Sequence, residues 1–121
     1  MATPKPKATI NKTIDGFYAA IEEFRKLHPN ITPNAILAFL IVATEPGITV
    51  GEVQKRLMSA SSSTVRALAL LSSTHRGGMD GLNLIRYDDD IKDRRVKHLY
   101  LKANGERVWS TLKKLLDVKE V

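Results

Sequence analysis

The sequence contains no cysteine, and this absence removes several kinds of function. Disulfide bonds, thiol nucleophiles and cysteine-based redox sensing are excluded, and a chain without disulfides suits the reducing cytosol. No apolar run reaches the roughly 18 residues that a membrane-spanning helix needs. The segment MATPKPKATINK, residues 1–12, has no apolar core of the kind found in a signal peptide. We therefore expect a cytosolic protein.

The short motifs of enzymes and metal sites are missing as well. The sequence has neither of the glycine-rich nucleotide motifs, G-x-x-x-x-G-K-S/T and G-x-G-x-x-G, so RGGMDG, residues 76–81, is expected to be a flexible connection. The serines at positions 61–63 have no nucleophile-elbow context. The histidines stand far apart and without H-x-x-x-H spacing: His28, His75 and His98. We expect no enzymatic activity, no metal and no cofactor, and surface or structural roles for the three histidines.

Positive charge is what the chain has in excess. Its 19 Lys and Arg against 13 Asp and Glu give a net charge of +6, which favours a polyanion as the partner. A chain of 121 residues suits one domain with a single hydrophobic core. Residues 1–12 hold two prolines and three lysines, and we expect a flexible basic arm there, followed by one domain over residues 13–119. The arm either touches DNA phosphates or serves only as a solubilising tail.

Helices are predicted by apolar residues at three- and four-residue steps. An amphipathic helix is expected over residues 13–28, and the apolar run AILAFLIVA, residues 35–43, predicts a second and central helix. Thr32 and Pro33 supply an N-cap and a first-turn proline for that second helix. A T-x-x-E capping box, Thr49 to Glu52, opens a short third helix.

A turn near Ser59 and a further helix over residues 61–75 complete a helix-turn-helix pattern. That helix opens with four hydroxyl side chains, of which a helix cap uses only one. The others would present small donors to DNA at a helix N-terminus, which also favours phosphate. The residues of this helix that we assign to DNA contact are Ser61, Ser62, Ser63, Thr64 and Arg66. Its buried stripe is expected to be Val65, Leu68 and either Leu71 or Ala69.

A β-hairpin with a charged tip is predicted over LIRYDDDIKDRRVKHLYL, residues 84–101. Asp93 stands two positions before Arg95, near enough to hold the guanidinium in one direction, and a held arginine suits a narrow minor groove. The basic residues that we assign to DNA contact are Lys92, Arg94, Arg95 and Lys97. The alternative is an ordinary solvated loop. Solvation is also the simpler account of the aspartates at positions 88–90, because three neighbours on a strand cannot all face one Mg²⁺ ion.

After the hairpin, Asn104 and Gly105 predict a turn, and a last amphipathic helix is expected to end near Lys119. This order of elements is that of a winged helix-turn-helix, a mostly α-helical fold with one small β-hairpin. The segment DRRVKHLYLKANGERV, residues 93–108, resembles the wing and following helix of the MarR-type (multiple antibiotic resistance regulator) transcription factors. That family shows D-x-R, then mostly apolar residues, then L-T-x-x-G. The matching positions here are Asp93, Arg95, Leu101 and Gly105.

The resemblance extends to ITVGEVQKRL, residues 48–57, and STVRAL, residues 63–68, and covers residues 13–119. It implies that Arg95 enters the minor groove, that Asp93 orients it, and that residues 61–66 face the major groove. It also implies a two-fold dimer in which the first and last helices of the two copies intertwine. Some family members release DNA when a small aromatic acid binds, but this sequence identifies no such effector. The resemblance also implies the cytoplasm of a bacterial cell, or the host cytoplasm if the protein is encoded by a bacteriophage.

Large apolar side chains on the first and last helices exceed what a three-helix core can cover. We assign these to a homodimer interface: Phe17, Tyr18, Ile21, Phe24, Trp109, Leu112 and Leu116. The alternative is that they pack on their own domain. A two-fold dimer would place two recognition helices about one DNA turn apart, roughly 34 Å, and so prefer a pseudo-palindromic site.

Two functions follow as hypotheses. The first is a sequence-specific regulator of transcription, a homodimeric repressor that binds a pseudo-palindromic site in double-stranded DNA through the helix over 61–75 and the wing over 84–101. The alternative is a MarR-like module for non-specific DNA binding, or for protein interaction, in replication or transcription. The two differ in specificity, since operator binders exceed their non-specific affinity by roughly 10³ or more.

Overall fold

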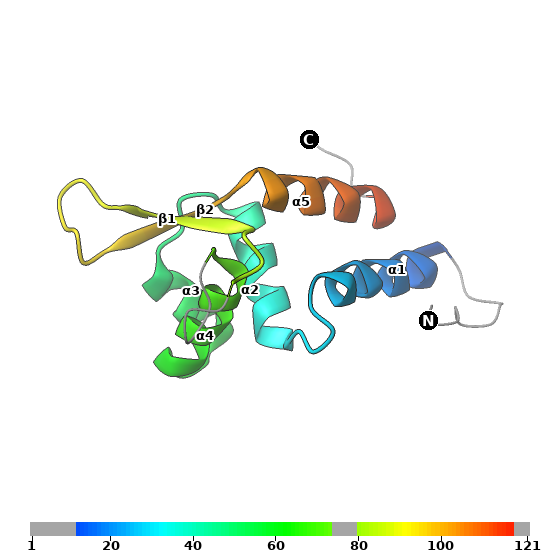
Figure 1. Ribbon diagram of the computed structural model, residues 1–121, viewed down its shortest axis with the longest axis horizontal. Helices are drawn as coiled ribbons and strands as arrows, with labels where there is room; N and C mark the ends of the chain where they lie inside the picture. Colours follow the sequence, from blue (N-terminus) through cyan, green and yellow to red (C-terminus); the bar gives the residue numbers. More distant parts are fainter. Residues whose placement is uncertain (1–11, 74–79, 118–121) are drawn as a thin grey trace.

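The computed structural model describes residues 12–73 and 80–117 of the chain. In chain order the elements are α1 (Lys12–Leu27), α2 (Pro33–Thr44), α3 (Val50–Leu57), α4 (Ser61–Leu71), β1 (Ile85–Asp89), β2 (Lys97–Leu101) and α5 (Ala103–Leu115) (Figure 1). The predicted fold class, mostly α-helical with a small hairpin, is confirmed. Outside the described residues lie the predicted basic arm up to residue 11, most of the glycine-rich connection, and both His75 and Lys119.

The molecule has two distinct ends (Figure 1). The β1–β2 hairpin, called the wing below, projects from one end, and α1 and α5 lie together at the other, with α2, α3 and α4 between them. α1 packs on α5, while α2 packs on α3, α4, α5 and β2. α2 is therefore the central element, as its apolar run predicts. Within residues 12–73 and 80–117, no helix combines the length and the hydrophobicity that a membrane crossing requires.

Local capping fixes where α2 and α3 begin. The Thr32 hydroxyl accepts from the Ala35 amide at 3.2 Å, and Pro33 follows at the first helical position. At α3, the Thr49 hydroxyl accepts from the Glu52 amide at 3.2 Å, and the Glu52 carboxylate accepts from the Thr49 amide at 3.1 Å. Both capping predictions are confirmed. The bonds from Thr49, its hydroxyl first and its amide second, hold the pKa of the Glu52 carboxyl below its ordinary value.

The core forms where α2 meets its neighbours. Phe39 is fully buried, and Phe24 of α1 meets it edge to face, with ring centroids 5.7 Å apart at 78°. Leu112 of α5 is fully buried in the same cluster. Phe24 and Leu112 had been assigned to a dimer interface, and that prediction is wrong. Each side chain is covered by its own domain, because Phe24 meets Phe39 of α2 and α5, which carries Leu112, packs on both α1 and α2.

The buried stripe of α4 also differs from the prediction. It consists of Thr64, Ala67, Leu68, Leu70 and Leu71, whereas Val65 is 54% exposed. The stripe follows helical steps of three and four residues from Thr64, so Val65 falls on the outer face. A hydroxyl can head this stripe because it is satisfied internally: the Thr64 oxygen lies 2.9 Å from the Ser59 hydroxyl and 3.3 Å from the Ala60 carbonyl. The helix ends at Leu71, before the predicted residue 75.

Asn104 and Gly105 form no turn, because both lie in the first turn of α5. A Cβ atom at Gly105 would stand 2.2 Å from the Leu84 carbonyl oxygen. Gly105 therefore allows α5 to pass directly against the backbone that leads into β1. α5 ends at Leu115, and Asp117 beyond it has a left-handed backbone with φ 53°, so this helix is shorter than predicted.

The wing is an antiparallel pair with Ile85 opposite Leu101 and Asp89 opposite Lys97. Its second strand is also bonded to the segment between α2 and α3. The Gly47 amide donates to the Leu99 carbonyl at 2.8 Å, and the Leu99 amide donates to the Ile48 carbonyl at 2.8 Å. These two bonds fix the base of the wing against the helix-turn-helix.

Candidate nucleic-acid interface

The wing tip carries one arginine that is exposed and yet held in place. Asp93 accepts from the Arg95 backbone amide at 3.0 Å, from Nε at 3.1 Å and from Nη2 at 3.2 Å. The Arg95 side chain is 91% exposed. These bonds from Arg95, the side chain first, hold the pKa of the Asp93 carboxyl below its ordinary value, so it stays a carboxylate near neutral pH. The expected pairing of Asp93 with Arg95 is therefore present in the structure.

The other charges of the wing are largely paired with one another. Asp88 pairs with Arg86, whose guanidinium also lies 4.6 Å from the centre of the Tyr100 ring. Asp89 pairs with Lys97 across the strands. The prediction of simple solvation is therefore wrong for Asp88 and Asp89, because Arg86 stands two positions before Asp88 on the same strand and the strand register places Lys97 opposite Asp89. Lys97, assigned to DNA contact, is half-buried and engaged by Asp89.

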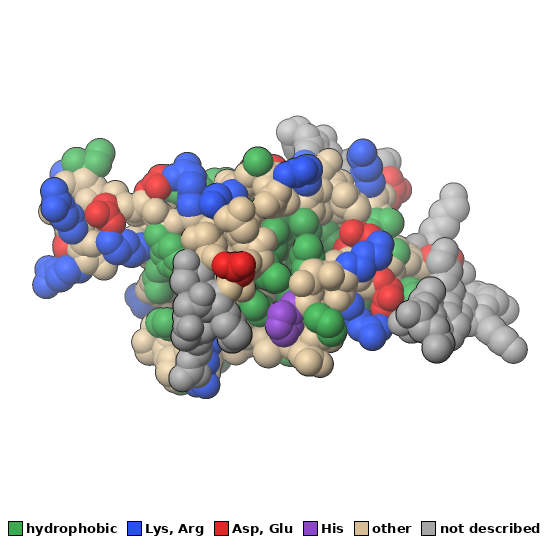
Figure 2. Space-filling model, in the orientation of Figure 1, with side chains coloured by type: hydrophobic (Ala, Val, Ile, Leu, Met, Phe, Trp, Pro, Cys, Tyr) green, Lys and Arg blue, Asp and Glu red, His purple; other side chains and the backbone are tan. Residues whose placement is uncertain are grey.

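The remaining cations of the tip face solvent. Lys92 and Arg94 are exposed, as is Ile91 between Asp90 and Lys92. Figure 2 shows Lys and Arg side chains gathered at this end of the molecule. The exposed charge at the wing tip is therefore mainly positive, although the sequence of the hairpin is nearly balanced.

His98 joins the wing to the turn before α3. Its Nδ1 lies 2.7 Å from the Gly47 carbonyl oxygen and its Nε2 lies 2.8 Å from Asp90 Oδ1. The predicted structural role for this histidine is thus realised at a specific joint. Sequence reasoning could not find the joint, because Gly47 and His98 are 51 positions apart.

The exposed face of α4 is small and polar. Ser61 and Ser62 are exposed, Ser63 is half-buried, and Arg66 is exposed with its Nε 3.3 Å from the Ser62 carbonyl oxygen. Thr64, assigned to DNA contact, is fully buried, so that assignment is wrong. Because Ala60 caps the helix without a side-chain bond, no hydroxyl of this face is used at the N-terminus. Sequence reasoning missed the exposure of Val65 on the same face.

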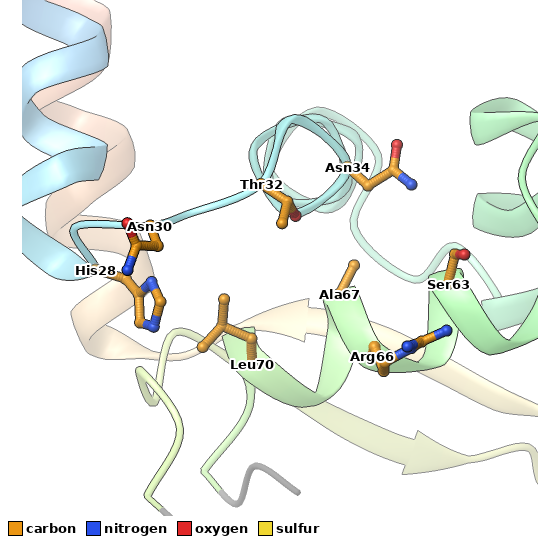
Figure 3. Close-up of a pocket in the computed structure, with 8 residues that line it drawn as sticks. All are labelled: His28, Asn30, Thr32, Asn34, Ser63, Arg66, Ala67 and Leu70. Atoms are coloured by element: carbon orange, nitrogen blue, oxygen red, sulfur yellow. The ribbon is translucent and has the colours of Figure 1, made fainter.

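A shallow hollow of about 410 Å³ lies beside α4 (Figure 3). Ser63 and Arg66 border it at one end, His28 and Asn30 of the α1–α2 connection at the other, and Leu70 lies between. The His28 Nδ1 atom is buried without a hydrogen-bond partner among the described residues. The hollow thus offers one guanidinium and a polar rim next to the proposed recognition helix.

The opposite end of the molecule exposes apolar side chains. Phe17 is 61% exposed and Leu116 is 41% exposed, while Tyr18, Ile21 and Trp109 are partly buried. Phe17, Ile21 and Leu116 border an entirely apolar groove of about 370 Å³ between α1, α2 and α5. α1 and α5 approach closely there, since a Cβ atom at Gly16 would stand 2.4 Å from the Leu115 carbonyl oxygen. Of the seven residues assigned to a dimer, the structure thus leaves five at least partly accessible.

Within residues 12–73 and 80–117, no group of three His, Cys, Asp or Glu side chains is placed to hold a metal ion. His28 and His98 lie in separate places, beside α4 and at the base of the wing. The chemistry available at the wing and on α4 is therefore that of hydrogen-bond donors and cations at a surface.

No protein-family model matches this chain, and no curated protein matches it. Solved structures do. The chain is similar to MarR, with a TM-score of 0.60 and 20% identity over 84% of this chain and 72% of that one. It is similar to a transcriptional regulator from Thermotoga maritima, with a TM-score of 0.67 and 19% identity over 88% of this chain and 65% of that one. It is also similar to MepR from S. aureus, solved in a complex with DNA, with a TM-score of 0.67 and 17% identity over 84% and 75% of the two chains.

The structural likeness spans more than four fifths of this chain in each of these comparisons. The chain therefore has the winged helix fold of the MarR-type transcriptional regulators.

Proposed function

We propose that this protein binds double-stranded DNA and regulates transcription. The observation that carries the proposal is the Arg95 guanidinium, 91% exposed at the wing tip and held by both carboxylate oxygens of Asp93. A guanidinium that is already oriented loses little rotamer freedom on binding, and a narrow minor groove attracts it. The structures of MepR and of Streptococcus pneumoniae FabT with DNA support this use of the fold.

α4 is the proposed recognition helix. Ser61, Ser62 and Arg66 line its exposed face, and the small serines let the helix N-terminus approach phosphate closely. Val65 stands among them and offers an apolar contact to the methyl group of thymine. On this proposal the helix reads the major groove while Arg95 occupies the adjacent minor groove.

The proposed assembly is a homodimer formed by the terminal helices. The exposed Phe17 and Leu116 flank an apolar groove that water would otherwise cover, and a second copy of the chain would bury it. A two-fold dimer places two copies of α4 about one DNA turn apart, roughly 34 Å, and favours a pseudo-palindromic site. Occupation of such a site in a promoter would repress transcription.

A second candidate function is non-specific DNA binding, or protein interaction, in replication or transcription. The observation that favours it is the composition of α4, whose exposed face has Arg66 as its one basic residue. Direct base readout depends mostly on arginine, lysine, asparagine and glutamine, so this face is poor in the usual readers.

Selection of bound fragments from a random duplex pool at about 150 mM salt separates the candidates, because salt at that level suppresses purely electrostatic binding. Enrichment of an inverted repeat is the expected result. Recovery without enrichment would favour the second candidate, and no recovery at all would contradict DNA binding. Sedimentation of the free protein tests the dimer independently.

A further inference from the structure

His98 occupies a joint between three parts of the fold. It lies on β2, faces the Gly47 carbonyl of the α2–α3 turn through Nδ1, and faces the wing-tip residue Asp90 through Nε2. The two distances are 2.7 Å and 2.8 Å, and the His98 side chain is 28% exposed. Both ring nitrogens therefore make short contacts, one on each side of the ring.

Both partners are acceptors. A carbonyl oxygen has no proton to give, so Nδ1 must carry the hydrogen of the Gly47 contact. Asp90 is held as a carboxylate, since the bond from His98, followed by bonds from the backbone amides, keeps the pKa of its carboxyl below the ordinary value. Nε2 must then carry a hydrogen as well. A ring with hydrogens on both nitrogens is an imidazolium cation.

The hydrogen bonds continue from Asp90 to the proposed DNA-binding arginine. Asp90 Oδ2 accepts from the Lys92 amide at 3.0 Å and from the Asp93 amide at 3.1 Å. Asp93 in turn holds Arg95 by its backbone and its guanidinium. One connected path thus runs from the α2–α3 turn through His98 and the wing tip to Arg95.

We propose that His98 is a positioning residue that, in its charged form, holds the wing tip and Arg95 in the orientation that binds DNA. This inference rests on the proposed function. The neutral ring that keeps the Gly47 bond turns the Nε2 lone pair toward the Asp90 carboxylate, so the second bond is lost and replaced by repulsion. Loss of that bond frees Asp90 and the turn that it caps, and DNA affinity falls.

The Gly47 carbonyl and the nearby carboxylates favour the charged form of His98. The pKa of His98 is raised above its ordinary value, first by the Gly47 carbonyl, then by Asp90, with a further contribution from Glu52 of α3. Asp88 lies opposite His98 in the strand register, but its carboxylate is taken by Arg86. A raised pKa means that the joint is complete below about pH 6.5, the ordinary value for histidine, and is lost as the pH rises through the higher folded value.

The exchange of one proton limits how steeply DNA affinity can change with pH. If DNA binds the charged form better, DNA must raise the pKa of His98 further. Between the free and the bound pKa, the dissociation constant for DNA rises by at most about tenfold per pH unit, because one proton is involved. The same dependence is absent from a protein in which residue 98 does not titrate.

The test has two readouts on the full chain at fixed ionic strength. Nitrogen-15 NMR of the imidazoles follows His98 between about pH 6 and 9, across the ordinary histidine pKa, without and with a mixed-sequence DNA duplex. Fluorescence anisotropy gives the dissociation constant of the same duplex over the same range. The variants are His98→Gln, which cannot titrate, and His28→Gln as the matched control at a half-buried histidine away from the wing. Circular dichroism confirms that each variant is folded.

We expect His98 to carry hydrogens on both nitrogens at pH 6, a pKa that rises further with DNA, and an affinity that weakens with pH in the wild type and in His28→Gln. His98→Gln is expected to bind more weakly than the wild type at pH 6, with no such dependence. A neutral His98 ring at pH 6, or an unchanged pH dependence in His98→Gln, would overturn the inference. Absence of DNA binding at pH 6 would overturn the proposed function and the coupling to DNA, while the NMR titration still decides whether the charged joint exists.

Discussion

The wing end and the α1–α5 end of this molecule are stabilised by different interactions. At the wing, Asp88, Asp89 and Asp93 each pair with a cation, and few side chains are buried. At the other end, α1 and α5 are held by apolar contacts, and Phe17 and Leu116 remain exposed beside an apolar groove. A tip of paired charges with one extended guanidinium suits a polyanion, whereas exposed aromatic and aliphatic surface suits another protein surface.

This difference teaches that the two ends offer surfaces of different chemistry, so that under the proposed function DNA and a second copy of the chain would not compete for one surface. Ion pairs at a surface contribute little to folding, so the Asp93–Arg95 pair serves mainly to orient Arg95. Apolar area contributes roughly 25 cal/mol per Å² when it is removed from water, so the α1–α5 end gains most from a second copy. Variants at the two ends should therefore change different measurements.

The largest effect is expected at Leu112, which lies under the α1–α5 end and is fully buried. Leu112→Ala should lower the free energy of unfolding by about 2 to 5 kcal/mol, because it removes buried methyl groups and leaves a cavity. Denaturant unfolding followed by circular dichroism measures this loss, with the wild type and the variant at the same protein concentration. Leu116→Ala is the control, and its smaller loss should depend on concentration because Leu116 is exposed in the single chain. Equal losses in the two variants would contradict the burial of Leu112.

Phe17→Glu should separate the dimer while the single domain stays folded. Phe17 is 61% exposed, so its side chain contributes little to the core and would contribute to the interface of the proposed dimer. Loss of a well-packed aromatic anchor costs about 2 kcal/mol or more, roughly thirtyfold in the dissociation constant of the dimer. Sedimentation velocity at several protein concentrations measures this dissociation constant. Ile91→Glu, a change at the exposed wing tip, is the matched control and should leave the dimer intact; a monomeric wild type would remove the distinction between the two ends.

Arg66→Ala should relax the discrimination between DNA sites by about 1 to 3 kcal/mol if the guanidinium touches a base edge. The measurement is the affinity of wild type and variant for the selected site and for a scrambled duplex. A uniform loss across both duplexes would instead identify Arg66 as a phosphate contact. Lys55→Ala on the exposed surface of α3 is the comparison, and it should change both affinities equally.

Arg95→Ala should weaken DNA binding about tenfold and reduce the salt dependence of binding by about one counterion, because one cation is withdrawn from the groove. The melting temperature should stay within the range of ordinary surface changes, since the side chain is almost fully exposed. Anisotropy titrations over a series of salt concentrations provide the slope. Lys92→Ala is the comparison, because the Lys92 ammonium, also at the tip, has no carboxylate ion pair among the described residues and should have the smaller effect. The reverse order would argue against Asp93 as the orienting residue.

Features that depend on near neighbours in the chain were predictable. The caps at Thr32 and Thr49 act over three residues, and the pairing of Asp93 with Arg95 acts over two. Helical spacing located α1, α2 and α3 to within a few residues, and the hairpin followed from its apolar strands and charged tip. In each case the interacting groups are brought together by local backbone geometry, whichever fold surrounds them.

Features that depend on which surface covers a residue were mispredicted. Val65 and Thr64 differ by one position on α4, and only the direction from which α2 approaches decides which of them is buried. The helical pattern placed Phe24 in a dimer interface, but in the structure Phe39 packs against its ring. Gly105 was predicted to lie in a turn, but in the structure its lack of a side chain allows α5 to pass close to the Leu84 carbonyl.

The sequence by itself determined the order of the elements, their caps, the excess of positive charge and the held arginine at the wing tip. The tertiary structure alone decided which aromatic side chains remain exposed, which hydroxyls of α4 face outward, and that His98 meets Gly47 across 51 positions of sequence. The physical reason is that hydrogen bonds between near neighbours are set by backbone dihedral angles. Burial and long-range pairing arise only when separate elements pack and exclude water from particular side chains.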